Sequence, residues 1–162
     1  MAAADEMSRQ LDLVGEEVTE SLGERIGAVA ESGLVLDLRG DLGAGKTALV
    51  RGLSRGLQVE GLVRSPTFTI ASLHKGPLSL LHVDAYRLDD PSELALHGWS
   101  DWLIEGVIAV EWAEKVEEIL PQRRLRIDLA HGGRNLRKAW IRATGPQAQD
   151  GVARAFEQAI VS

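Results

Sequence analysis

The stretch LVLDLRGDLGAGKTALVRGL, residues 34–53, decides the fold class of this chain. Residues 34–38 form a short apolar run, which is typical of a strand covered on both faces. Residues 40–45 are rich in glycine, and Leu49, Leu53 and Leu57 then recur at helical spacing. Strand, glycine-rich turn and helix in this order open an α/β unit, so we predict an α/β fold.

The turn from Gly40 to Thr47 matches the phosphate-binding pattern G-x-x-x-x-G-K-[ST] in full. Glycines let the backbone curl so that N–H groups point at a polyphosphate, and the helix beginning near Lys46 adds its positive dipole end. Lys46 would charge-pair with the β- and γ-phosphates, and the Thr47 hydroxyl would ligate Mg²⁺. The alternative is a turn that merely joins strand to helix. We predict nucleotide contacts along the loop, from Asp41, Leu42, Gly43, Ala44, Gly45, Lys46 and Thr47.

The rest of the chain supplies the other elements of a layered fold. Strands are expected at 9–13, 67–73, 78–83 and 107–110, with a closing hairpin from 124–130 and 136–143. Helices are expected at 14–31, 46–56, 91–96, 98–104, 113–119 and 147–160, the first burying Val18, Leu22, Ile26 and Val29. We predict a P-loop NTPase-type three-layer fold with a mainly parallel central sheet and antiparallel hairpins at its edge. It would be a single domain over residues 1–162, with residues 1–8 flexible.

Two carboxylates end apolar runs and suit the chemistry that a P-loop needs. Asp84 follows residues 80–83, and Glu111 follows residues 107–110. Acids at the carboxyl ends of buried strands lie where ligands of open α/β sheets bind. Either acid could hold Mg²⁺ or polarise an attacking water; alternatively, each is a solvated strand end or a helix cap. We predict Lys46, Asp84 and Glu111 as the catalytic residues.

Single polar and aromatic residues give weaker signals. Thr67 could sense a γ-phosphate through Mg²⁺, or cap an ordinary turn. Trp112 could flank the site or pack in the core. His82 and His97 are expected to pack or cap. Three arginines could neutralise phosphate charge in a transition state: Arg87, Arg134 and Arg137.

Composition excludes several classes of function. The chain has 162 residues, no cysteine and a net charge of −6. Disulfides, thiolate zinc sites and cysteine nucleophiles are therefore ruled out, and an acidic chain is a poor candidate for a freestanding nucleic-acid binder. No run approaches the roughly 20 apolar residues of a membrane helix, and the start does not have the pattern of a secretory signal. We expect a cytoplasmic protein without membrane contact.

The motifs together resemble the TsaE family (also called YjeE), small bacterial ATPases of tRNA threonylcarbamoyladenosine synthesis. The resemblance rests on GDLGAGKT at 40–47, SPTFT at 65–69, HVDAYRL at 82–88 and VEW at 110–112. Their order and spacing cover about residues 10 to 145. A P-loop alone is shared by many families, but these elements together are far more specific.

The resemblance implies a role in an assembly that modifies tRNA. It implies an ATP- and Mg²⁺-dependent ATPase that supports TsaD and its companion TsaB at adenosine 37 of tRNAs reading codons that begin with A. tRNA would be met only indirectly, through the complex. Thr47 and Glu111 would hold Mg²⁺, Asp84 would be needed for activity, and Glu16 and Arg134 would approach the nucleotide. Family members often carry Gly-Arg-Glu-Ala-Arg near the end, where this chain has GRNLR at 133–137.

Three other functions remain open from the sequence. A small-molecule kinase needs an acceptor site and usually an arginine-rich lid, for which we see no clear insertion. A GTPase-type binding module commonly uses Asn-Lys-x-Asp, which this chain lacks. A structural subunit with a vestigial P-loop would show no turnover even with partner proteins.

Overall fold

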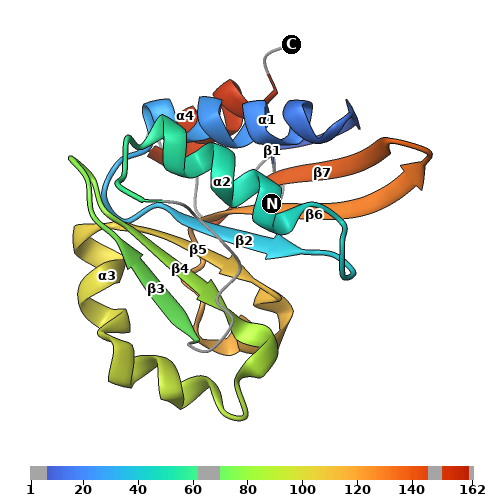
Figure 1. Ribbon diagram of the computed structural model, residues 1–162. Coiled ribbons are helices and arrows are strands. Elements are labelled where there is room, and N and C mark those ends of the chain that lie inside the picture. Colours follow the sequence, from blue (N-terminus) through green and yellow to red (C-terminus); the bar gives the residue numbers. More distant parts are fainter. Residues whose placement is uncertain (1–6, 62–69, 146–150, 161–162) are drawn as a thin grey trace, which may run out of the picture.

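The computed structural model describes residues 7–61, 70–145 and 151–160, in which seven strands form one mixed sheet (Figure 1). In spatial order the strands are β1 (Met7–Val14), β7 (Leu136–Thr144), β6 (Arg124–Gly133), β2 (Val35–Arg39), β5 (Val107–Glu111), β4 (Leu80–Asp84) and β3 (Ala71–His74). The pairs β6–β2, β2–β5 and β5–β4 are parallel. The pairs β1–β7, β7–β6 and β4–β3 are antiparallel. The predicted α/β class, with a parallel centre and antiparallel pairs toward the edges, is confirmed.

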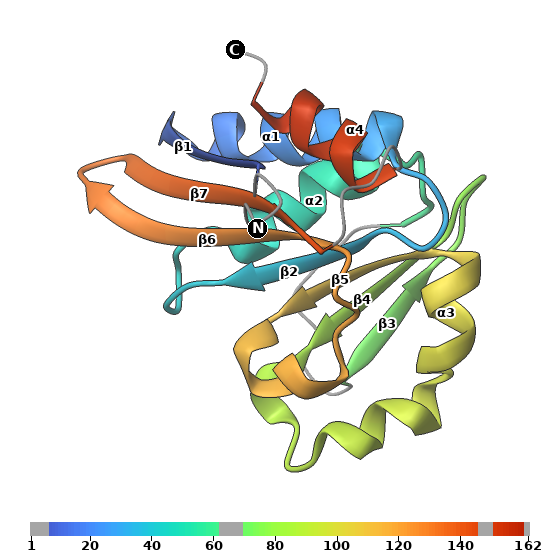
Figure 2. The same ribbon diagram turned by 180° about the vertical axis from the view of Figure 1, so that it is seen from behind.

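Helices lie on both faces of the sheet (Figures 1 and 2). One face carries α1 (Glu16–Val29), α2 (Lys46–Gly56) and α4 (Gly151–Ala159). The other carries α3 (Trp99–Glu105) and the 3₁₀ helices η1 (Ala85–Arg87), η2 (Pro91–His97) and η3 (Ala113–Ile119). Strand β2 shows how the sequence builds both layers: Leu36 and Leu38 join the core under α2, while Val35 joins the opposite core. This alternation follows from the two-residue period of a strand.

The buried face of α1 differs from the predicted one. Leu22 and Ile26 are fully buried as expected, but Val18 is 39% exposed. Part of the buried face is instead made by glycines, Gly23 and Gly27. Hydrophobic periodicity misses this face because glycine carries no apolar side chain.

Those glycines let α1 and α2 pack backbone against backbone. A Cβ on Gly23 would lie 2.1 Å from the carbonyl oxygen of Leu49, and one on Gly52 would lie 1.8 Å from the oxygen of Glu20. Real Cβ atoms do not approach other atoms so closely, so larger residues would push the helices apart. The helix that follows the glycine-rich turn is therefore held tightly against its neighbour.

Several element boundaries differ from those expected. Met7 and Ser8, expected in a flexible end, are the first residues of β1, and residues 1–6 lie outside the described part. Helix α1 begins at Glu16 because Gly15, at φ 88°, ends the strand. The helices expected at 91–96 and 113–119 are 3₁₀ helices. Of the strand expected at 67–73, only residues from 70 onward are described, and β3 begins at Ala71.

The helices of the described residues are too short to span a membrane. Helix α1 has 14 residues, fewer than the roughly 20 that cross a bilayer. In the described ranges, no helix combines the length and the apolar character that crossing would need.

Candidate functional site

The glycine-rich turn between β2 and α2 is a tight loop whose glycines have positive φ values. Gly40, Gly43 and Gly45 have φ values of 144°, 79° and 111°, which favour glycine. A Cβ on Gly40 would lie 2.3 Å from the carbonyl oxygen of Leu129, so the loop also packs closely on β6. Helix α2 begins after Gly45 without a side-chain cap, and the first turn of a helix has N–H groups with no intrahelical partner. A loop of this kind before a helix N-terminus is suited to bind an anion.

Lys46 is a buried cation at the centre of this loop. It is only 5% exposed, and its Nζ donates to the carbonyl oxygens of Gly40 and, at 3.0 Å, Asp41. The same nitrogen lies 4.2 Å from the ring centroid of Trp112. Burial lowers the pKa of Lys46, and nearby acids, Glu111 foremost, only partly offset this effect. The groups that contact the Lys46 ammonium are carbonyl oxygens and an aromatic ring, which carry no net charge. The ammonium can therefore still form an ion pair with an anion that enters the site.

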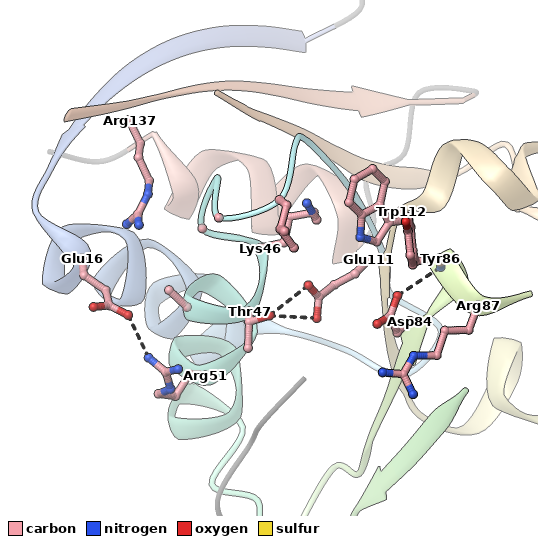
Figure 3. A pocket seen from close by; sticks show the side chains of 14 residues that line it. Glu16, Lys46, Thr47, Arg51, Asp84, Tyr86, Arg87, Glu111, Trp112 and Arg137 are labelled. Carbon is pink, nitrogen blue, oxygen red and sulfur yellow. Dashed lines mark hydrogen bonds and ion pairs between the residues drawn. The ribbon is translucent and has the colours of Figure 1, made fainter. Parts of the chain in front are cut away.

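Thr47 and the two strand-end acids lie next to this lysine (Figure 3). The hydroxyl of Thr47 donates to the Glu111 carboxylate, at 3.0 Å to Oε1 and 3.3 Å to Oε2. Asp84 is the register partner of Glu111 across the parallel pair β4–β5. Its carboxylate accepts a 3.0 Å hydrogen bond from the main-chain nitrogen of Tyr86. The carboxyl ends of adjacent parallel strands bring these groups together.

The donor set fits magnesium rather than a metal held by protein alone. No cluster of three or more His, Cys, Asp or Glu side chains in the described ranges could hold a metal ion. Mg²⁺ usually takes one or two protein ligands and fills its other positions with phosphate oxygens and water. A hydroxyl and a carboxylate already in contact, beside a loop suited to bind an anion, meet that requirement.

These groups open onto a pocket of about 570 Å³. Eleven residues named from the sequence line it: Glu16, Leu42, Gly43, Gly45, Lys46, Thr47, Asp84, Arg87, Glu111, Trp112 and Arg137. The other lining residues are Ala48, Arg51 and Tyr86. Elements far apart in the sequence therefore converge on the P-loop pattern.

Four predicted residues are not in the pocket lining. Asp41 contributes through its carbonyl oxygen, which holds Lys46, and Ala44 is fully buried. Thr67 lies outside the described residues. Arg134 lies between β6 and β7, whereas Arg137 lines the pocket and would contact a Cβ on Gly45. Of the three arginines named from the sequence, Arg87 and Arg137 line the pocket and Arg134 does not.

Sequence reasoning missed three residues around the site. Arg51 follows Thr47 by one helical turn, and this spacing would have placed it on the same side of α2. Tyr86 comes two residues after Asp84, and its ring centroid lies 5.0 Å from that of Trp112, with the rings tilted by 48°. His82, expected to pack or cap, is fully buried with its Nε2 2.5 Å from Glu111 Oε2.

Comparison with known proteins identifies the family of this chain. A family model described as "Threonylcarbamoyl adenosine biosynthesis protein TsaE" matches residues 13–139. The chain belongs to the TsaE family. A Bacillus subtilis protein named tRNA threonylcarbamoyladenosine biosynthesis protein TsaE is 43% identical, with 82% of this chain and 84% of that protein covered. A Streptomyces coelicolor protein of the same name is 50% identical, with 68% and 79% covered.

A solved structure of the family is also similar. The crystal structure of Bacillus subtilis YdiB superposes with a TM-score of 0.71 at 34% sequence identity. The match covers 88% of this chain and 90% of that one. The likeness therefore extends over most of the seven-stranded architecture.

Proposed function

We propose that this TsaE family member is a P-loop ATPase that binds ATP·Mg²⁺ and supports threonylcarbamoyladenosine formation in tRNA. One observation carries the proposal: Lys46 is buried against the glycine-rich loop, while the adjacent Thr47 contacts Glu111 at 3.0 Å. The three-layer arrangement around this loop supports an assignment to the P-loop NTPase-type folds. The family description and the names of the relatives support the tRNA modification.

Each residue has a distinct task in the proposed reaction. Lys46 and the loop amides bind the β- and γ-phosphates, and Thr47 with Glu111 would hold Mg²⁺. The bound metal would neutralise the charge that develops on phosphate oxygens. Asp84 orients the attacking water and accepts its proton. Trp112, whose ring lies on Lys46, shields the phosphate end of the pocket from solvent.

The proposed partners are TsaD and TsaB, with tRNA bound through their complex rather than by this chain directly. Hydrolysis would be slow for the isolated protein and would depend on these partners. The net charge of −6 supports indirect contact with tRNA, because a freestanding binder usually carries a basic face. Cytoplasmic localisation and a single domain stay predictions.

Calorimetric titration tests nucleotide binding and base preference together. We expect ATP to bind in the presence of Mg²⁺ and GTP to bind more weakly. Lys46→Met should abolish ATP binding because it removes the buried charge. Lys75→Met changes an exposed lysine in the turn between β3 and β4 and should leave binding unchanged. Preferential GTP binding would contradict the proposal.

A turnover assay with and without TsaB and TsaD then separates the remaining functions. We expect phosphate release that rises when both partners are present, and capture of both partners with a non-hydrolysable ATP analogue. A phosphorylated metabolite would favour a kinase instead. Absence of turnover even with the partners would indicate a structural subunit.

A further inference from the structure

His82 is a fully buried imidazole beside the predicted magnesium ligands. It lies on β4, whose other residues before Asp84 are the buried aliphatic Leu80, Leu81 and Val83. The parallel register of β4 with β5 pairs His82 with Ala109, two residues before Glu111. His82 and Glu111 therefore lie on the same side of adjacent strands, under α2.

Two side chains hold the Glu111 carboxylate. His82 Nε2 lies 2.5 Å from Oε2, and Thr47 Oγ1 lies 3.0 Å from Oε1 and 3.3 Å from Oε2. A carboxylate that ligates Mg²⁺ is ionised and can only accept hydrogen bonds, so in that state Nε2 carries the proton and donates it. The carboxylate is held from both sides and cannot rotate freely.

We propose that His82 is a positioning residue that fixes the Glu111 carboxylate toward Thr47 and thereby sets the affinity of the site for Mg²⁺. This inference rests on the proposed function, since it concerns the same nucleotide site. Outer groups that hydrogen-bond a metal ligand orient it and strengthen the metal site. His82 has no contact with the pocket itself, so it acts through Glu111.

The second ring nitrogen argues against a purely structural histidine. Nδ1 of His82 is buried and has no hydrogen-bond partner among the described residues. A buried polar atom without a partner destabilises a fold by about 1–3 kcal/mol. A leucine, as at the neighbouring positions of β4, would avoid this cost. The hydrogen bond between Nε2 and the Glu111 carboxylate therefore explains why an imidazole occupies this position.

A pair of substitutions separates the hydrogen bond from packing. His82→Gln retains an amide donor near the position of Nε2, whereas His82→Leu fills the space without a donor. ADP affinity is measured by calorimetry, first in excess chelator and then across a Mg²⁺ series. We expect all three proteins to bind ADP alike without metal. The Mg²⁺ concentration that gives half of the affinity gain should rise about tenfold in His82→Leu and stay near the parent value in His82→Gln.

The outcomes distinguish this inference from the proposed function. If the parent protein fails to bind ADP, the proposed function and this inference both fall. If the parent binds with Mg²⁺ dependence and His82→Leu matches it, only the inference falls. Equal loss in both variants would also overturn it, because the donor would then be irrelevant. Should His82→Leu not fold, His82→Asn replaces it, since its shorter amide cannot reach Glu111.

Discussion

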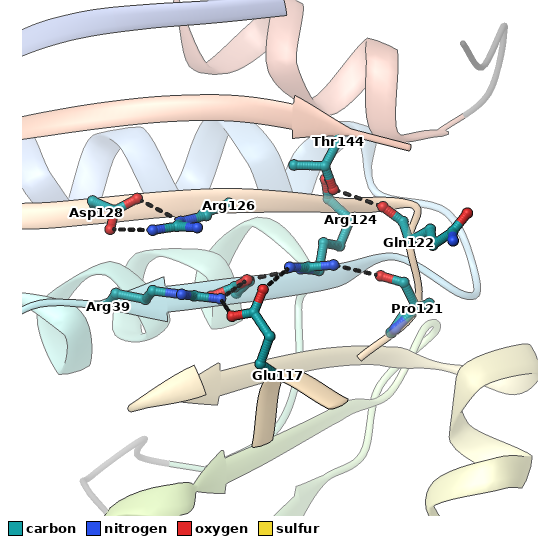
Figure 4. Close-up of polar contacts among 9 residues, drawn as sticks. Arg39, Glu117, Pro121, Gln122, Arg124, Arg126, Asp128 and Thr144 are labelled. Carbon is teal, nitrogen blue, oxygen red and sulfur yellow. Dashed lines mark hydrogen bonds and ion pairs between the residues drawn. The ribbon is translucent and has the colours of Figure 1, made fainter. Parts of the chain in front are cut away.

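Two buried polar clusters lie on opposite faces of the same sheet and are built on different principles. The ion network joins Asp37, Arg39, Glu117 and Arg124 beside η3 (Figure 4). The phosphate-site cluster joins Lys46, Thr47, His82 and Glu111 beneath α2. Both clusters are largely shielded from water, but only in the ion network do the positive and negative charges pair with one another.

In the ion network every charge has an opposite partner. Asp37, wholly buried, accepts from Arg39 Nε at 2.8 Å and from Arg124 Nε at 2.7 Å. Glu117 binds both arginines from η3. Burial lowers the pKa of Arg39, but the hydrogen bonds and charges of Asp37 and Glu117 more than offset this and raise it above its ordinary value. Two acids and two arginines satisfy one another.

The phosphate-site cluster is incomplete by comparison. Lys46 is held by carbonyl oxygens and an indole ring, and burial lowers its pKa. His82 has a buried nitrogen with no partner in the described part of the chain. A charge in the balanced network cannot be removed without leaving its buried partners uncompensated, whereas the unbalanced charge of Lys46 lowers the stability of the free protein.

The largest expected effect comes from breaking the balanced network at its centre. Asp37→Ala leaves Arg39 and Arg124 without their buried acceptor, and should lower the free energy of unfolding by about 3–5 kcal/mol. Urea denaturation measures this value. Asp128→Ala is the control, because its pair with Arg126 lies on the same sheet but is about 30% exposed, and should cost at most about 1 kcal/mol. Similar losses in both variants would contradict a buried centre at Asp37.

The second effect is smaller and has the opposite sign. Lys46→Met removes a buried charge that forms no ion pair with an acid among the described residues, and should raise the free energy of unfolding by up to about 1 kcal/mol while abolishing ATP binding. Urea denaturation of the free protein and calorimetry measure the two results. A loss of stability beyond about 2 kcal/mol would assign Lys46 to the fold rather than to the ligand.

Sequence patterns predicted the phosphate-site cluster better than the ion network. The P-loop pattern is local, so Lys46 and Thr47 could be placed directly, and the strand ends added Glu111. Asp37 gave no such signal, because Arg124, which donates to it, and Glu117, which binds the same arginines, come from distant segments whose packing no local pattern encodes. The same reason explains His82 and the glycine contact between α1 and α2. Non-local contacts of ordinary residue types become visible only in the folded chain.

The third prediction uses pH to measure how much the buried charge of Lys46 lowers the free energy of unfolding. Between its lowered pKa in the folded chain and its ordinary value of 10.5, the unfolded chain binds the proton more tightly. Stability contributed by this group therefore rises with pH through that window. The stability advantage of Lys46→Met over the parent should shrink as pH rises from neutral toward 10.5. An advantage independent of pH would mean that the charge of Lys46 is not its cause.

The smallest effect is expected at the exposed margin of the ion network. The side chain of Glu117 is 53% exposed, so its bonds to Arg39 and Arg124 are screened by water. Glu117→Gln should lower the free energy of unfolding by at most about 1 kcal/mol, and salt should reduce the difference further, as urea denaturation at two ionic strengths would measure. Since both arginines keep Asp37, the centre of the network persists. If Glu117→Gln lowered the free energy of unfolding as much as Asp37→Ala, the main stabilising contact of the network would lie between η3 and the sheet. Glu117, rather than Asp37, would then be the residue that balances the two arginines.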